Sequence, residues 1–126
     1  MALEAALKFK ETCGIQAEAF SGAEIQHGPM ALIEEGYPLL VLALRGPAQA
    51  GLLALADQMR ARGALVLLAA PEGTPHVNLP IAPTASTDLD PISAIQSFYP
   101  MVEALARARG MNPDHPPYLA KVTRTH

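Results

Sequence analysis

Two carboxylates, an amine and an imidazole fall close together near the start of the chain. Glu4, Lys8 and Glu11 are spaced at i, i+4 and i+7, so in a helix they share one face. His27 follows in a His-Gly-Pro turn. A carboxylate can move a proton between atoms, and an imidazole exchanges protons near neutral pH, so this set could perform acid–base chemistry. The same spacing also occurs on solvated helix faces, and a single turn histidine is commonly structural, so spacing does not establish catalysis.

A helix, a turn and a second helix are expected to position these side chains. Residues 2–12 are rich in Ala, Leu, Lys and Glu, the strongest helix formers, and Gly14 follows them as a helix stop. A short helix is expected over residues 22–26 and is expected to resume over residues 30–33. The His-Gly-Pro sequence between these two segments requires a break in regular structure.

Three apolar segments further along the chain predict strands. Residues 38–44 and 64–70 are continuous apolar runs, which are typical of strands covered on both faces of a parallel sheet. Residues 76–81 predict a shorter strand at an edge, because Pro80 cannot donate a hydrogen bond to a ladder.

Two longer helices are predicted between and after these strands. The first runs from Pro47, in its first turn, to about Arg62. The second runs to Arg109 and begins at Asp90, which is expected to act as its N-cap. Pro100 lies inside this helix and is expected to kink it.

The order of these elements predicts the fold class. Strand, helix, strand, strand and helix form an α/β pattern of three layers, in which helices flank a parallel sheet. The chain reads as a single domain over residues 1–126, without an internal repeat, a low-complexity block or a linker. Half of its residues are apolar, which is enough for a sizeable core.

Composition and charge argue against several classes of protein. The net charge is −3 and the Lys and Arg residues are scattered, whereas nucleic-acid-binding domains normally carry a basic stripe with aromatic side chains. No apolar run approaches the ~20 residues that cross a bilayer. From the charge distribution and the apolar runs together, neither nucleic acid nor membrane is expected as a partner. The single Cys13 fits a reducing cytoplasm. His76, His115 and His126 show no ligand spacing, so neither a metal nor a cofactor is expected.

Four segments of the chain carry a resemblance to a known family. They are ALEAALKFKE at residues 2–11, AEAF at 17–20, EIQHGPMALI at 24–33 and LAKVT at 119–123. In this order they resemble the second, C-terminal sugar-isomerase (SIS) domain of the glucosamine-fructose-6-phosphate aminotransferase and glucosamine-6-phosphate deaminase family. The resemblance implies the SIS fold, a parallel sheet flanked by helices, and a phosphorylated hexose or hexosamine as substrate.

The resemblance also implies roles for individual residues. Glu11 matches the family's proton-shuttling glutamate, His27 its ring-opening histidine, and Lys121 its Schiff-base lysine. Glu4 and Lys8 match charged residues that surround this glutamate, and they are predicted to bind substrate. Because relatives supply the histidine to the site of the neighbouring subunit, the resemblance implies a homodimer.

The beginning of the chain departs from the family pattern. Family members place a glycine-rich strand before the first helix and a complete SIS domain before that strand, whereas this chain begins within the helix. We therefore expect a partial SIS domain whose sheet lacks its first strand. The unpaired backbone groups at that edge are expected to be covered by a partner chain.

The expected function is one half of a cytoplasmic hexosamine-phosphate isomerase, belonging either to a deaminase or to an isomerising aminotransferase. The sequence contains no glutaminase domain, so release of ammonia from glutamine is not expected of this chain, and the isolated segment could be inactive. Two alternatives stay open: a non-catalytic phosphosugar-binding SIS module, and a structural half that completes a partner's site. The joint presence of Glu11, His27 and Lys121 favours the enzyme.

Overall fold

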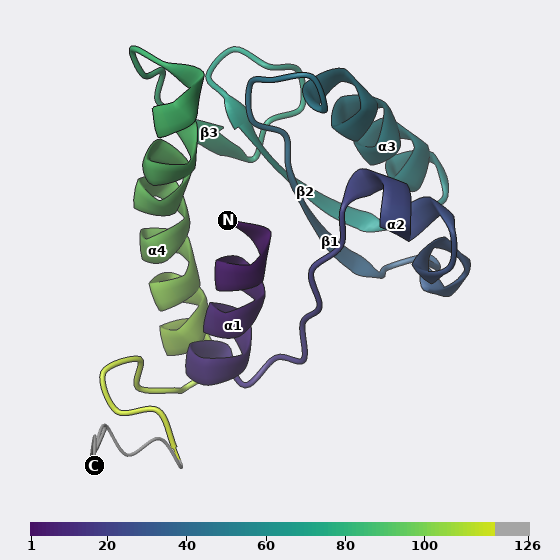
Figure 1. The fold of residues 1–126 in the computed structure, drawn as a ribbon. Helices are drawn as coiled ribbons and strands as arrows, with labels where there is room; N and C mark the ends of the chain where they lie inside the picture. The colour runs from purple at the N-terminus through teal and green to yellow at the C-terminus, as the bar shows by residue number, and fades with distance from the viewer. Residues whose placement is uncertain (118–126) are drawn as a thin grey trace, which may run out of the picture.

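The computed structural model describes residues 1–117 and arranges them in three layers (Figure 1). The helices are α1 (Ala2–Cys13), α2 (Gly22–Gln26), the 3₁₀ helix η1 (Pro29–Leu32), α3 (Gln49–Ala61), the 3₁₀ helix η2 (Thr87–Leu89) and α4 (Asp90–Ala108). The strands are β1 (Pro38–Leu42), β2 (Leu65–Pro71) and β3 (Leu79–Ile81). α1 and α4 lie on one face of the sheet, and α2 and α3 lie on the other. The predicted α/β class with a parallel sheet is confirmed.

The three strands form one parallel sheet in the order β1-β2-β3. β1 pairs with β2 from Pro38 opposite Leu65, and β3 pairs only with the last residues of β2. Pro80 lies in β3 at the edge, as predicted, where its missing N–H costs no ladder hydrogen bond. Among residues 1–117, β1 pairs with no strand other than β2, so its outer edge is open.

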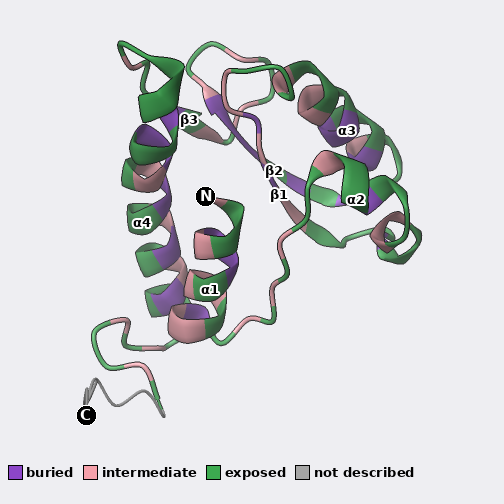
Figure 2. Cartoon of the chain, viewed as in Figure 1, coloured by how far each residue is buried: buried purple, intermediate pink, exposed green. Residues whose placement is uncertain are grey.

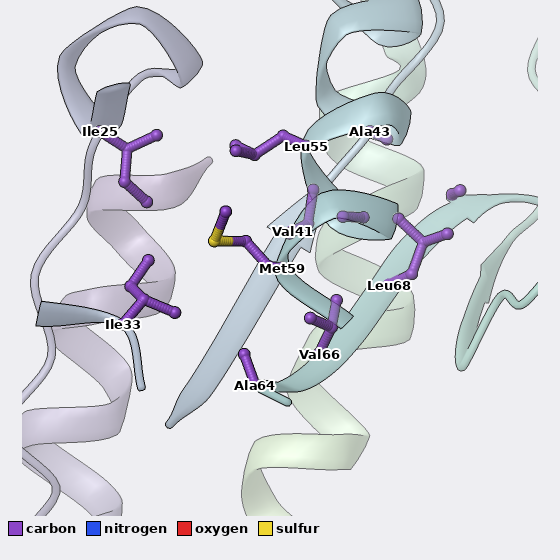
Figure 3. Packing of buried hydrophobic residues seen from close by; sticks show 11 residues of the cluster. Ile25, Ile33, Val41, Ala43, Leu55, Met59, Ala64, Val66 and Leu68 are labelled. Carbon is purple, nitrogen blue, oxygen red and sulfur yellow. The ribbon is translucent and has the colours of Figure 1, made fainter. Parts of the chain in front are cut away.

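The larger apolar core fills the space between the sheet and the α2–α3 layer. Figure 3 shows Ile25 of α2 and Ile33 pointing toward Met59 of α3. Met59 is fully buried, and alternate side chains of β1 and β2 complete the cluster. This core holds α2, and therefore the turn behind it, against the sheet.

A second core joins α1 to α4 on the opposite face. Phe98 of α4 is fully buried and meets Phe9 of α1 edge to face, with ring centroids 5.5 Å apart. Cys13 is also fully buried, and its thiol donates to the Val102 carbonyl at 3.4 Å. Its role is thus packing, as expected for a lone cysteine without a nearby base. Figure 2 shows buried positions along the face of α4 that this core covers.

Two predicted helix starts are corrected by the structure. Pro47 lies in a turn and α3 begins at Gln49, two residues later than expected. Asp90 is the first residue of α4 and not its N-cap, because its carboxylate binds distant groups described below. Pro100 lies inside α4, and the helix runs continuously from Asp90 to Ala108.

Candidate functional site

The three charged residues of α1 do lie on one face of the helix. Lys8 Nζ donates to Glu11 Oε2 at 3.0 Å and lies 3.9 Å from Glu4 Oε1. Each of the three side chains is about one-third exposed or less (31%, 33% and 28% for Lys8, Glu4 and Glu11). The sequence therefore placed these residues together correctly, and the structure adds that Lys8 prefers Glu11 as its partner.

Tyr99 of α4 completes this cluster, and sequence analysis missed it. Its hydroxyl donates to Glu4 Oε1 at 2.8 Å across the α1–α4 interface. The two residues are 95 positions apart, so no local spacing could have indicated the contact. Together the contacts form a polar chain from Tyr99 through Glu4 and Lys8 to Glu11.

A surface groove of about 570 Å³ borders this cluster. It runs between α1, α4 and the segment that follows α4, and its lining residues are Lys8, Thr12, Tyr99, Pro100, Val102, Glu103, Pro113 and Asp114. The groove is open to solvent and presents both an ammonium group and carboxylates. A polar ligand with hydroxyl groups could therefore bind beside the Lys8–Glu11 pair.

Hydrogen bonds within the cluster raise the pKa values of two of its side chains. The hydrogen bond to Glu11 raises the pKa of the Lys8 ammonium above its ordinary value, with a smaller contribution from the Glu4 charge. The hydrogen bond to Glu4 raises the pKa of the Tyr99 phenol. Lys8 is therefore held as a cation and Tyr99 as a neutral donor at neutral pH.

His27 lies at the end of α2, in a different part of the molecule. Its backbone N–H bonds to the Glu24 carbonyl as the C-cap of the helix, and its side chain is exposed. A shallow groove beside it is lined by Gln26, His27, Gly28, Met30, Ala31 and Arg62. Arg62 comes from the end of α3 and adds a positively charged side chain to this groove.

The Glu24 side chain is engaged in the cap of α2 and not with the His27 imidazole. Its carboxylate accepts from the Ser21 backbone N–H at 2.7 Å, while the Ser21 hydroxyl accepts from the Glu24 N–H. This capping box lowers the pKa of Glu24 and fixes the start of α2. Glu24 therefore has a structural role in the helix that precedes His27.

Within one chain the structure does not bring Glu11 and His27 together. α1 packs on α4 on one face of the sheet, whereas α2 packs with α3 on the other face (Figure 1). His27 lines the groove beside α2, whereas Lys8, the ion-pair partner of Glu11, lines the α1–α4 groove. Lys121, the third predicted catalytic residue, lies outside the described residues.

A partly buried charge cluster at the carboxyl end of the sheet was also missed by sequence analysis. Arg45, just after β1, donates from Nε and Nη2 to the two carboxylate oxygens of Asp90, at 2.7 and 2.5 Å. Thr84 Oγ1 donates to the same carboxylate at 2.6 Å. These contacts lower the pKa of Asp90 to about 2. The cluster ties the segment after β1 to the start of α4.

The part of the chain that the structure describes contains no group of three or more metal-ligating side chains arranged to hold a metal ion. Within the same residues, no helix combines the length and the apolar character that a membrane crossing requires.

Sequence comparison finds one family model and several curated relatives that match this chain. The SIS domain family model matches residues 1–106. A glutamine–fructose-6-phosphate aminotransferase (isomerising) from Aeropyrum pernix is 41% identical over 130 aligned residues, which cover 96% of this chain and 20% of that protein. The chain thus spans about a fifth of the length of the curated relatives that it matches.

Two solved structures share the fold. A candidate phosphosugar isomerase from Silicibacter pomeroyi is 44% identical with a TM-score of 0.73, and the match covers 90% of this chain and 35% of that one. Glucosamine-6-phosphate deaminase from Thermotoga maritima is 29% identical with a TM-score of 0.69, and the match covers 94% of this chain and 35% of that one.

Proposed function

The chain belongs to the SIS domain family, and from this premise we propose that it forms the isomerase half of a hexosamine-phosphate enzyme. The proposed substrates are fructose 6-phosphate and glucosamine 6-phosphate. Relatives that carry these sugars in their names include both an isomerising aminotransferase and a deaminase. The proposal does not choose between these two parents, because the residues concerned belong to the half that both share.

The Lys8–Glu11 pair beside the α1–α4 groove is the observation that carries this proposal. Fructose 6-phosphate and ammonia give glucosamine 6-phosphate and water, or the reverse. The amine replaces the oxygen at C2 and the carbonyl moves between C2 and C1, so a base must remove a proton from one of these carbons and return it to the other. Glu11 is proposed as that base, since a carboxylate can both accept and return the proton. The sugar gains and loses no electrons overall, and the enzyme ends in its starting protonation state.

Lys8 and Glu4 are proposed to bind substrate and to orient the base. The Lys8 ammonium holds the Glu11 carboxylate through a 3.0 Å hydrogen bond and retains donors for a sugar hydroxyl. Its raised pKa keeps the positive charge in place as charge develops on the sugar oxygen.

His27 is proposed to open the sugar ring. The fold supports the proposal that the histidine of each site comes from a second copy of the chain. Glu11 and His27 lie on opposite faces of the sheet in one chain, so a complete site requires a histidine from elsewhere. The proposed homodimer would supply it from the neighbouring subunit. Leu65 and Leu67 of β2, which are 58% and 39% exposed, also leave apolar surface for association.

Glu11→Gln tests the proposed base. In the natural protein this change keeps the size and the hydrogen-bonding capacity of the side chain but removes the base, so isomerisation should fall by ~10²-fold or more. Substrate binding should change little. Glu34→Gln, the same change at an exposed position before β1, should retain full turnover. Near-normal turnover of Glu11→Gln would refute the proposal.

A further inference from the structure

Glu4 lies near two possible partners, Lys8 and Tyr99, and its short contact is with Tyr99. It lies one helical turn before Lys8, and Glu-to-Lys at i, i+4 is the favoured orientation for an ion pair on a helix. Nevertheless the distance from Glu4 Oε1 to Lys8 Nζ is 3.9 Å, whereas the Tyr99 hydroxyl lies 2.8 Å from the same oxygen. Lys8 makes its short contact, 3.0 Å, with Glu11 instead.

The position of the Tyr99 hydroxyl is defined by the α1–α4 core. Phe98, the preceding residue, is fully buried and contacts Phe9 of α1. The rings of Phe98 and Tyr99 lie 6.2 Å apart in a tilted arrangement. Tyr99 follows this buried residue on α4, and its hydroxyl reaches Glu4 on the surface of α1.

We propose that Tyr99 is a positioning residue of the candidate site: by engaging Glu4, its hydroxyl leaves Lys8 to bind Glu11 and so holds the Glu11 carboxylate in one orientation. Without the hydroxyl, Glu4 competes with Glu11 for the same ammonium group, and the Glu11 carboxylate becomes less well ordered. The effect on turnover rests on the proposed function, whereas the effect on the Lys8–Glu11 pair does not.

The other charged groups nearby do not replace this hydrogen bond. Glu103 of α4 and Asp114 also line the groove, and both are acidic, so neither can donate to Glu4. Arg107 is engaged with Glu103 at 2.8 Å. In the described part of the chain, Tyr99 is thus the donor that α4 offers to the α1 cluster.

Tyr99→Phe isolates the hydroxyl, because it keeps the ring that packs beside Phe98. Tyr37→Phe is a matched control, since Tyr37 is comparably exposed (44% against 41%) and lies before β1, away from the cluster. In the 126-residue chain, titration of Lys8 by ¹⁵N NMR should show a further rise of its pKa in Tyr99→Phe, because Glu4 is then free to approach the ammonium. Tyr37→Phe should leave the Lys8 titration unchanged.

Kinetics of the natural protein provide a second readout. Tyr99→Phe should lower kcat about tenfold with little change in KM, which is the scale of losing one hydrogen bond to a charged group. In a Glu4→Ala background the same change should have no further effect, because Tyr99 acts through Glu4. A side chain that merely stabilised the fold would act equally in both backgrounds.

The possible results separate this inference from the proposed function. If Tyr99→Phe matches Tyr37→Phe in both the Lys8 titration and kcat, the positioning role is wrong, whatever Glu11→Gln does. If Glu11→Gln retains turnover, the proposed function fails, and the Lys8 titration alone decides whether Tyr99 controls the pair.

Discussion

At the scale of single residues, the α1 cluster shows how a common surface pattern can become a candidate site. Glu4, Lys8 and Glu11 would be an ordinary ion-paired face on an isolated helix, worth a few tenths of a kcal/mol per pair. Packing against α4 leaves these side chains about two-thirds buried and borders them with a groove. Tyr99 then engages Glu4, so that one pairing of Lys8 is preferred over the other.

The role proposed for Lys121 can be tested by chemical trapping. If this lysine forms a Schiff base with the ketose, borohydride added to the natural protein with fructose 6-phosphate should fix a covalent adduct on Lys121. Lys121→Arg should abolish trapping while preserving the charge, because a guanidinium is not a usable nucleophile at neutral pH. Mass spectrometry of tryptic peptides locates the adduct, and an adduct on Lys8 or Lys10 would contradict the assignment.

Asp90 should make the fold sensitive to acid. Its pKa in the folded state is about 2, below the ordinary value of 3.8, so between about pH 4 and pH 2 the unfolded chain takes up the proton first. The stability that the Arg45–Asp90 contact contributes is complete above this window and is lost as the pH falls through it. Thermal melts of Asp90→Asn should therefore show a lower midpoint at neutral pH, and the difference from the unaltered protein should vanish near pH 2.

Asp57→Asn is the matched control for this experiment. Its carboxylate is 70% exposed and pairs with Arg60 one turn later on α3. Because exposed pairs contribute little, this variant should retain the acid-dependent loss of stability. An identical pH profile for Asp90→Asn and the unaltered protein would show that the Arg45–Asp90 contact does not stabilise the fold.

At the scale of elements, the end of α1 determines where its charged face stops. Gly14 follows the helix with φ +62°, a left-handed conformation that glycine adopts without strain. The chain then turns back, and the Ile15 N–H bonds to the Phe9 carbonyl at 3.0 Å. This cap keeps Glu11 in the last turn of α1 while Cys13 enters the core.

Gly14→Ala should therefore destabilise the protein. A Cβ at this position would lie 3.2 Å from the end of the Met111 side chain, and the left-handed backbone costs about 1–2 kcal/mol for a residue with a Cβ. Urea denaturation should show a loss of that size. Gly51→Ala, in the first turns of α3 with open space around it, should instead stabilise by about 0.5–1 kcal/mol. Equal effects of the two changes would contradict this account of the cap.

At the scale of the whole molecule, the sheet separates the two proposed catalytic groups. The cores on its two faces hold α1 with α4 and α2 with α3, so no small movement brings His27 to Glu11 within one chain. A site that uses both residues must therefore combine two copies or involve a larger assembly.

Complementation between two inactive variants tests such shared sites. Glu11→Gln and His27→Ala chains, co-produced with different tags in the natural protein, should recover about a quarter of the native activity in a random mixture of dimers. Half of the dimers are then mixed, and each mixed dimer contains one intact site. Glu11→Gln mixed with the double variant should recover nothing. Activity no higher than that of the separate variants would show that the two residues do not meet across an interface.

The sequence by itself determined the fold class, most of the elements and the residues of the α1 face. Helix formers, a glycine stop and apolar runs act through local conformational preferences, so α1 and the short helix Gly22–Gln26 were predicted nearly to the residue. The edge position of the strand that contains Pro80 could be predicted because proline has no N–H to donate to a neighbouring strand.

Only the tertiary structure decided the contacts between residues that are distant in the chain. Tyr99 reaches Glu4 because the buried Phe9–Phe98 contact sets α4 against α1, and Arg45 draws the Asp90 carboxylate away from its expected capping role. Neither contact has a local signal, since both depend on how apolar faces pack together. The same packing placed Glu11 and His27 on opposite faces of the sheet.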